Sequence, residues 1–291
     1  MSVVENKVKD LLKKSGNVFV YCGTAIPRSI GLNGVIAEHI AYDIEDYYGY
    51  SSEEIMTESF LTRRVKLFFD YYQNIMLGKT DPGIPKAAYL IKELQEYINI
   101  ETISTNNVYG LYEKAGCENV IAVNGCVEKN TCPSCGKTFD ANYVRANRII
   151  PLCDKCKVPL RPGFTLIGET IDNGLITKAI NAVEKADTFL VIGSSLRNKI
   201  FKNLIKYYEG NNLILINTEE LFGDDIANYR IYGDITDCLE RITEDIKKEL
   251  PKREKKKVVE EADEEEADTK KEDTTGKADA KEADAKEADA K

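Results

Sequence analysis

The sequence predicts an α/β fold in which helices cover a parallel sheet. Four short apolar runs, rich in β-branched and aromatic residues, alternate with stretches that have the apolar spacing of helices. Three of these runs lead into Gly, Ser or Asn, which is typical of parallel strands that enter a ligand-binding loop at their carboxyl ends. With 43% hydrophobic residues in a chain of 291, there is ample material for such a core.

The expected elements follow in order along the chain. Residues 1–14 have helical spacing and precede the first predicted strand, 17–22. Further strands are expected at 100–104, 188–192 and 213–216, and further helices at 86–97, 174–185 and 200–208. Residues 35–95 break this alternation with several Tyr- and Phe-rich helical segments, which predicts a helical insertion.

The composition changes at Pro251. Residues 251–291 contain no aromatic residue and carry 11 basic and 15 acidic side chains, so 4 of the 9 net negative charges belong to them. Such a segment cannot offset its ordering entropy by burial, so we predict a folded domain over 1–250 and a disordered, charged, low-complexity tail over 251–291. The basic cluster Lys252–Lys257 has two interpretations, a nuclear-import signal and a solvated charge run.

The sequence also argues against several classes of protein. It contains no apolar run near the ~18 residues of a membrane span, and its N-terminus lacks the apolar region of a secretory signal. The acidic balance argues against broad nucleic-acid binding. We therefore expect a soluble cytoplasmic or nuclear protein. The single histidine, His39, lies in a helical stretch and is expected to be packed or solvent-facing rather than catalytic.

Four cysteines form two C-x-x-C pairs that are separated by seventeen residues. This spacing is typical of a zinc ribbon, in which four thiolates converge on one ion and leave no open position for catalysis. We predict one structural zinc per chain in a small inserted module at about 126–160. Two redox pairs or buried free thiols are the alternatives. The predicted ligands are Cys132, Cys135, Cys153 and Cys156.

Beyond these features, the chain resembles the sirtuins from about residue 5 to residue 245. The resemblance lies in the zinc module and in five sequence blocks, namely T-N-N-V-Y-G-L-Y-E-K-A-G at 105–116, N-V-I-A-V-N-G at 119–125, R-P-G-F-T-L-I-G-E at 161–169, G-S-S-L at 193–196 and L-I-N at 215–217. Sirtuins are NAD-dependent protein-lysine deacylases. The resemblance implies a large domain with a Rossmann-like parallel sheet that carries the zinc module, with NAD and an acylated lysine meeting in the cleft between them.

The resemblance also implies particular site residues. NAD or ADP-ribose would contact Gly23, Thr24, Ala25, Asn106, Asn107, Gly193, Ser194, Ser195 and Asn217. An acylated-lysine protein or peptide would pair in extended form with Leu166, Ile167, Gly168 and Glu169. The alternative for both sets is ordinary strand ends and a connecting strand.

Several family positions are substituted. The family's catalytic histidine, which acts as general base on a ribose hydroxyl, corresponds to Asn124, and an asparagine cannot accept that proton. Loss of a general base typically slows catalysis by about 10²–10⁴-fold. The family motif D-F-R is absent from residues 31–36, and an aspartate near the nicotinamide carboxamide is replaced by Tyr109. We therefore expect weakened or lost deacylation.

Two classes of function remain open from the sequence. The first is a divergent NAD-dependent enzyme, either a deacylase or an ADP-ribosyl transferase or hydrolase. The second is a non-catalytic module that binds an adenine nucleotide, ADP-ribose or an acylated peptide and acts as scaffold or regulator.

Overall fold

The computed structural model describes residues 3–147 and 149–253. Apart from residues 251–253, the predicted tail lies outside the described residues. Lys252 and Arg253 belong to the basic cluster, and both contact the end of helix α7 (Lys86–Gln95). The Lys252 ammonium pairs with the Glu96 carboxylate at 2.6 Å, and the Arg253 N–H donates to the Glu96 carbonyl. The rest of that cluster is outside the described part of the chain.

Six parallel strands form the main sheet, in the order β3-β2-β1-β6-β7-β8. All four predicted strands are present, and their bounds differ from the prediction by at most one residue at each end. The two strands that the sequence did not reveal, β3 and β8, lie at the sheet edges and are partly exposed, so they lack a continuous apolar run. The strands are β1 (Val18–Cys22), β2 (Ile100–Thr105), β3 (Val120–Ala122), β6 (Thr188–Ile192), β7 (Asn212–Asn217) and β8 (Tyr229–Tyr232).

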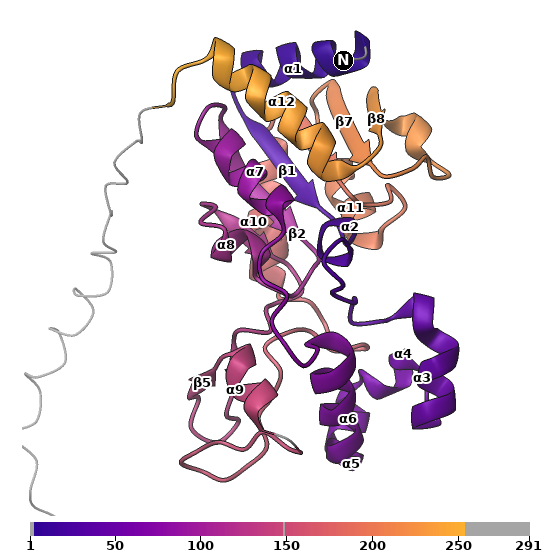
Figure 1. Ribbon diagram of the computed structural model, residues 1–291. Coiled ribbons are helices and arrows are strands. Elements are labelled where there is room, and N and C mark those ends of the chain that lie inside the picture. The colour runs from indigo at the N-terminus through magenta and orange to yellow at the C-terminus, as the bar shows by residue number, and fades with distance from the viewer. Residues whose placement is uncertain (1–2, 148, 254–291) are drawn as a thin grey trace, which may run out of the picture. The chain divides into compact units, whose positions relative to one another are not determined.

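Alternate side chains of each central strand enter two separate cores, because successive residues of a strand point to opposite faces of the sheet. In β1, Val18 and Val20 pack on one face, and Phe19 and Tyr21 pack on the other. Helices cover both faces (Figure 1). The first face carries α1 (Val3–Lys14), α7, α8 (Leu111–Lys114) and α12 (Ile235–Glu249), and the second carries α10 (Asn173–Glu184) and α11 (Lys199–Leu204).

The helical insertion packs around an aromatic core that includes Phe68, Phe69 and Tyr72 and that also takes in residues from other segments, such as Val144. The insertion is shorter than the predicted 35–95. Helix α7 packs against the sheet through residues such as Ile91 and Leu94, so the separate helical part ends near Met76. Its elements are the 3₁₀ turn η1 (Glu38–Ile40), α3 (Ala41–Tyr48), α4 (Ser52–Ile55), α5 (Glu58–Arg63), α6 (Val65–Tyr71) and the π-helical turn Tyr72–Met76.

The cysteine-containing module is built on a two-stranded antiparallel pair, β4 (Asn130–Thr131) and β5 (Thr138–Phe139), followed by α9 (Ala141–Ala146). Its own core is small and includes Cys132, Phe139 and Leu160. Figure 1 shows this module and helices α3–α6 beyond the carboxyl end of β1. The predicted α/β fold, with a zinc-ribbon-like module and a helical insertion, is therefore confirmed.

Within the described residues, we found no helix that is both long enough and apolar enough to cross a membrane.

Candidate functional site

A cavity of about 910 Å³ lies at the carboxyl ends of the central strands. The strand order reverses between β1 and β6, and the loops that leave these two neighbours diverge, which opens a crevice in doubly wound sheets. The volume is at the upper end of the range for small-molecule sites. The residues that line it include Thr24, Ala25, Arg28, Gly34, Val35, Ile36, Glu38, Asn106, Asn107, Tyr109, Asn124, Gly193, Ser194, Ser195, Arg197, Asn198, Asn217, Thr218 and Glu219.

Two glycines bring the ends of β1 and β6 into close contact. A Cβ on Gly23 would lie 2.3 Å from the Gly193 carbonyl oxygen and 2.5 Å from the Ser194 Cβ. Gly193 has a φ of +63°, and its carbonyl accepts the Ala25 N–H at 3.0 Å. Gly193 lines the cavity, whereas Gly23 does not line it but packs directly against Gly193 and Ser194; this junction is called the cavity floor. Because Gly193 has no side chain, its backbone forms this part of the cavity wall, at a point where a phosphate group could approach closely.

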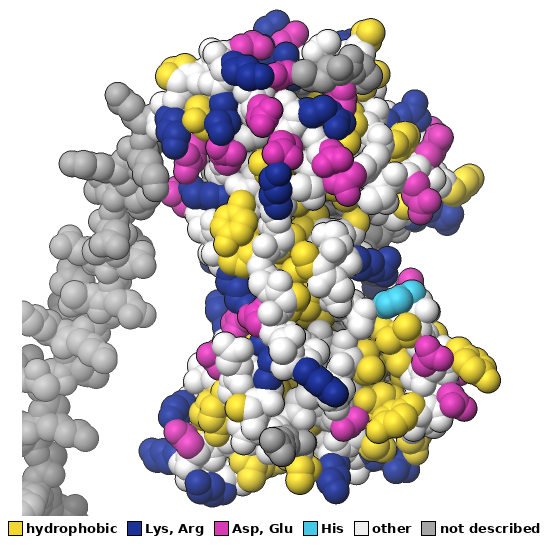
Figure 2. Space-filling view, in the orientation of Figure 1, with side chains coloured by type: hydrophobic (Ala, Val, Ile, Leu, Met, Phe, Trp, Pro, Cys, Tyr) yellow, Lys and Arg dark blue, Asp and Glu magenta, His cyan; other side chains and the backbone are white. Residues whose placement is uncertain are grey.

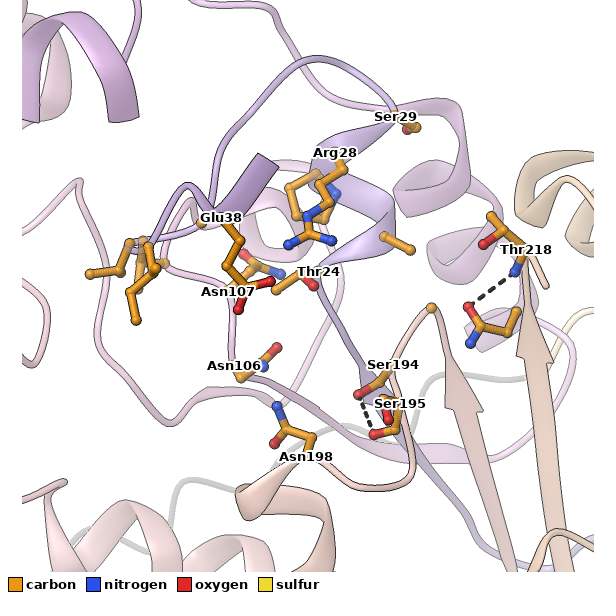
Figure 3. A pocket seen from close by; sticks show the side chains of 18 of the residues that line it. Thr24, Arg28, Ser29, Glu38, Asn106, Asn107, Ser194, Ser195, Asn198 and Thr218 are labelled. Atoms are coloured by element: carbon orange, nitrogen blue, oxygen red, sulfur yellow. Dashed lines mark hydrogen bonds between the residues drawn. The ribbon is translucent and has the colours of Figure 1, made fainter. Parts of the chain in front are cut away.

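Hydroxyl and amide groups gather where β6 and β7 end. Ser194 and Asn217 are buried, and Ser195 is half-buried. The Asn217 Oδ1 accepts the Thr218 N–H at 3.0 Å, and the Ser194 hydroxyl donates to the Ser195 carbonyl at 3.2 Å (Figure 3). The structure therefore brings together the predicted polar groups of these two strands.

Three asparagines lie at the other end of the cavity, after β2 and β3. Asn107 is held in its own turn, because its Nδ2 donates to the Thr105 hydroxyl at 2.6 Å and its Oδ1 accepts the Tyr109 N–H. The Asn106 Oδ1 is buried and has no hydrogen-bond partner. Figure 3 shows the Asn106 side chain in the cavity, between the loop that carries Thr24 and the end of β6. An unsatisfied acceptor in this place fits a ligand N–H or O–H group.

Asn124 is held by both its side chain and its backbone. Its Nδ2 donates to the Asn106 carbonyl at 2.9 Å, and its own carbonyl accepts the Thr165 N–H at 2.9 Å. The next residue, Gly125, has a φ of +80°, and a Cβ there would lie 2.4 Å from the Gly163 carbonyl oxygen. With Nδ2 engaged, the Asn124 Oδ1 is left to accept a hydrogen bond from a hydroxyl group, but it cannot remove that proton.

Tyr109 is buried, and burial raises the pKa of its phenol above the ordinary value, so the phenol stays protonated. Its hydroxyl lies within hydrogen-bond distance of the backbone carbonyls of Asn33 and Met76, which share its one proton. No fixed negative charge therefore occupies this position at neutral pH. Among the described residues that line the cavity, the carboxylates belong to Glu38 and Glu219.

Sequence reasoning missed four charged residues of the cavity wall. Arg28, Glu38, Arg197 and Glu219 line the cavity, and Arg197 also stacks on the Phe222 ring at 5.0 Å. Glu219 lies two residues beyond Asn217, the residue that follows the predicted strand 213–216, so the strand-end rule could have found it. No sequence pattern pointed to Arg28 and Glu38, because the course of the chain after β1 brings them to the cavity.

The predicted peptide segment lies beside the cavity rather than in its wall. The Thr165, Leu166 and Ile167 N–H groups are already engaged, by the Asn124 carbonyl, by the Glu169 carboxylate and by the Met56 carbonyl. Gly168 has a φ of +91° and is exposed. Glu169 also accepts two hydrogen bonds of 2.6 Å from the Arg161 guanidinium, which fixes the shape of the segment.

The four predicted cysteine ligands converge. Their sulfur atoms all lie within 4.8 Å of one another, and the Cys135 and Cys153 sulfurs are 3.8 Å apart. Each C-x-x-C turn is followed by a residue of positive φ, Gly136 at +72° and Lys157 at +60°. Four thiols in this arrangement fit a tetrahedral zinc site.

His39 does not contribute to the cavity. It is exposed on the 3₁₀ turn η1 and is visible at the surface in Figure 2. It is not among the residues that line the cavity, in agreement with the prediction of a non-catalytic histidine.

Comparison with known proteins gives one consistent family. Residues 34–199 match the model of the Sir2 family. The NAD-dependent protein deacetylase of Clostridium tetani is 32% identical over 241 residues, which cover 82% of this chain and 97% of that protein.

Solved structures agree with these sequence matches. A structure solved to explain the mechanism and regulation of Sir2 enzymes superposes with a TM-score of 0.75 at 26% identity. The match covers 85% of this chain and 98% of that chain. A Sir2 protein bound to an acetylated peptide has a TM-score of 0.68 at 23% identity, covering 84% of this chain and 98% of its own.

Proposed function

Because this chain belongs to the Sir2 family, we propose that it is an NAD-dependent protein deacetylase in which the step that needs a general base is slow. The single observation that carries this proposal is the cavity at the carboxyl ends of β1, β2, β6 and β7. It has a close-packed glycine floor, serine and asparagine groups at one end and an unsatisfied asparagine acceptor at the other. These features fit a dinucleotide.

We assign the binding roles as follows. Ser194, Ser195 and Asn217 hold the adenosine half, and the backbone around Gly193 faces the pyrophosphate. The Asn106 Oδ1 accepts a hydrogen bond from the nicotinamide half. When bound, NAD supplies the ribose that takes up the acyl group. These assignments rest on the places of the residues in the cavity wall.

Asn124 has an orienting role in this proposal. Because its Nδ2 is engaged with the Asn106 carbonyl, its Oδ1 can receive a ribose hydroxyl and fix its direction. The Asn124 amide has no titratable group, so it cannot take the proton of that hydroxyl as a histidine could. We therefore expect turnover about 10²–10⁴-fold below that of an enzyme with a histidine in this place.

The acylated peptide would lie along the segment that contains Gly168. This residue is exposed, while its neighbours are fixed by internal hydrogen bonds, so the segment offers a rigid edge for an extended chain. The cysteine cluster would hold a structural zinc that fixes the module from which this segment emerges. Because zinc-binding cysteines have to stay reduced, the cluster also supports a location in a reducing intracellular compartment.

The proposal is tested with the purified full-length chain, NAD and an acetyl-lysine peptide. Nicotinamide release and loss of the acetyl group, followed together by mass spectrometry, should show slow, coupled turnover. Asn124→Ala should lower the rate further, because the hydroxyl loses its orienting partner. Turnover that is unchanged in Asn124→Ala would refute the role of this residue. Calorimetric binding of ADP-ribose with no turnover would instead support a non-catalytic binding module.

A further inference from the structure

The loop at residues 31–36, here called the cofactor loop, forms part of the cavity wall through Gly34, Val35 and Ile36. Its sequence lacks the D-F-R motif of the family. Its backbone is nevertheless held at two places by hydrogen bonds from side chains of other segments. We propose that Tyr109, Tyr71 and Asn33 form a clasp that holds the cofactor loop in its binding position before any ligand arrives.

The first part of the clasp joins the loop to the turn after β2. Tyr109 is buried, with 4% of its surface exposed. The single proton of its hydroxyl is shared between the Asn33 carbonyl and the Met76 carbonyl, the latter at 3.2 Å. The Asn33 amide donates in turn to the Ile75 carbonyl at 2.9 Å. Asn33 is thus tied through both its backbone and its side chain.

The second part holds the loop two residues further on. The Tyr71 hydroxyl, from the end of α6, lies 3.1 Å from both the Val35 carbonyl and the Ser52 hydroxyl, and the Tyr71 side chain is fully buried. Burial raises the pKa of both phenols. Both remain protonated donors through the physiological range, so the clasp does not open with pH.

The attachment point for Asn33 and Tyr109 is the carboxyl end of the π-helical turn. A helix end leaves carbonyl groups without intrahelical partners, and π-turns leave them at unusual positions. Here three successive carbonyls are satisfied by side chains from three different segments. Ile75 accepts from Asn33, Met76 accepts from Tyr109, and Leu77 accepts from Arg145 of helix α9.

The function of such a clasp follows from the equilibrium of the loop. If the loop is closed in the free protein, a ligand does not have to use part of its binding energy to close it. Tyr109 and Asn33 are then positioning residues for the cofactor site. Tyr109 stands where the family has an aspartate, and in this proposal it positions the cofactor loop.

Hydrogen exchange of the full-length protein without ligand tests the clasp. The Gly31 and Leu32 amides donate to the Arg28 and Pro27 carbonyls, so they report on closure of the loop. In Tyr109→Phe we expect exchange in the segment 30–37 to be about tenfold faster, since a hydrogen bond is lost and a buried carbonyl is left unsatisfied. Asn33→Ala, a milder change at a half-buried position, should give the same direction of effect.

Tyr208→Phe is the matched control. The Tyr208 phenol donates to the Asp187 carbonyl at 2.9 Å and does not line the cavity, so its loss should leave exchange in 30–37 unchanged. Equal exchange in the wild type, Tyr109→Phe and Asn33→Ala would overturn the proposal.

A second measurement, the affinity for ADP-ribose by calorimetry, connects the clasp with binding. It rests on the proposed function, and the loss expected in Tyr109→Phe is again about tenfold. An unchanged affinity alongside faster exchange would overturn the positioning role. If the wild type bound no ADP-ribose, the proposed function would fail, while exchange in the free protein would still decide whether the clasp exists.

Discussion

Substitution of Gly23 by Ala should damage the cavity floor by a steric clash with the backbone. The added Cβ would lie 2.3 Å from the Gly193 carbonyl oxygen, 2.5 Å from the Ser194 Cβ and 2.6 Å from the Ser194 Cα. None of these atoms can rotate away, because two belong to the backbone and the third is fixed to it. The ends of β1 and β6 must therefore move apart.

The size of the effect follows from the contacts at this junction. Overpacking in a well-packed interior costs about 1–3 kcal/mol. The movement also lengthens two hydrogen bonds, Gly23 N–H to Ile192 carbonyl at 2.8 Å and Ala25 N–H to Gly193 carbonyl at 3.0 Å, and weakening them adds about 1 kcal/mol. We expect a total loss of about 2–4 kcal/mol in the free energy of unfolding. For a folded part of this size, that lowers Tm by roughly 5–15 °C.

Urea denaturation followed by circular dichroism measures the loss, and calorimetry with ADP-ribose measures the effect on the site. Gly83→Ala is the control. Gly83 has a φ of +84° and does not line the cavity, and a Cβ added there would meet no atom within 4 Å beyond its own chain neighbours. This variant should lose about 1–2 kcal/mol through backbone strain alone and keep its affinity for ADP-ribose. Gly23→Ala should lose both stability and affinity for ADP-ribose.

Wild-type stability in Gly23→Ala would show that the strand ends are not as close as the structure places them. A stability loss with unchanged ADP-ribose affinity would refute the view that this junction forms the floor of a cofactor site.

Three further predictions concern other parts of the molecule. In Asn124→His, a ring Nδ1–H can replace the Nδ2 donor to the Asn106 carbonyl and leave Nε2 facing the cavity. The rate of deacetylation should rise, and it should increase with pH through about 6.5, a pH dependence that the wild type lacks. Cys132→Ser should abolish the single zinc found by metal analysis and lower Tm, whereas a metal-free, fully stable wild type would contradict the zinc site. Lys157→Gly should raise the free energy of unfolding by about 0.5–1 kcal/mol in urea titrations, because glycine adopts the φ of +60° without strain; no gain would argue against that backbone conformation.

The central strands and the cysteine module could be predicted from the sequence for local physical reasons. Strands buried on both faces have to be apolar at successive positions, so 17–22, 188–192 and 213–216 stand out in the sequence. Zinc ligation demands thiols at turn spacing, so the two C-x-x-C pairs identify their own site. The edge strands β3 and β8 have neither a continuous apolar run nor cysteines at turn spacing. Each pairs with a neighbouring strand on one side only and is partly exposed, so its residues need not all be apolar.

The boundary of the helical insertion was predicted less well. Helix α7 has an amphipathic pattern like the helices before it, and periodicity does not say which core an apolar face enters. The structure assigns α7 to the sheet, through Ile91 and Leu94, and ends the insertion near Met76.

The sequence by itself determined which chemistry is absent. With one histidine in 291 residues and Asn124 in the family position, the chain has no histidine base at that place in the sequence. Only the tertiary structure decided what the substituted residues do instead. Tyr109 and Asn33 are 76 residues apart, and their hydrogen bonds to each other and to the end of the π-helical turn depend on how the loops after β1 and β2 meet. Composition and spacing describe neighbours along the chain, whereas a cavity wall is made of groups that are distant in the sequence and that the fold brings together.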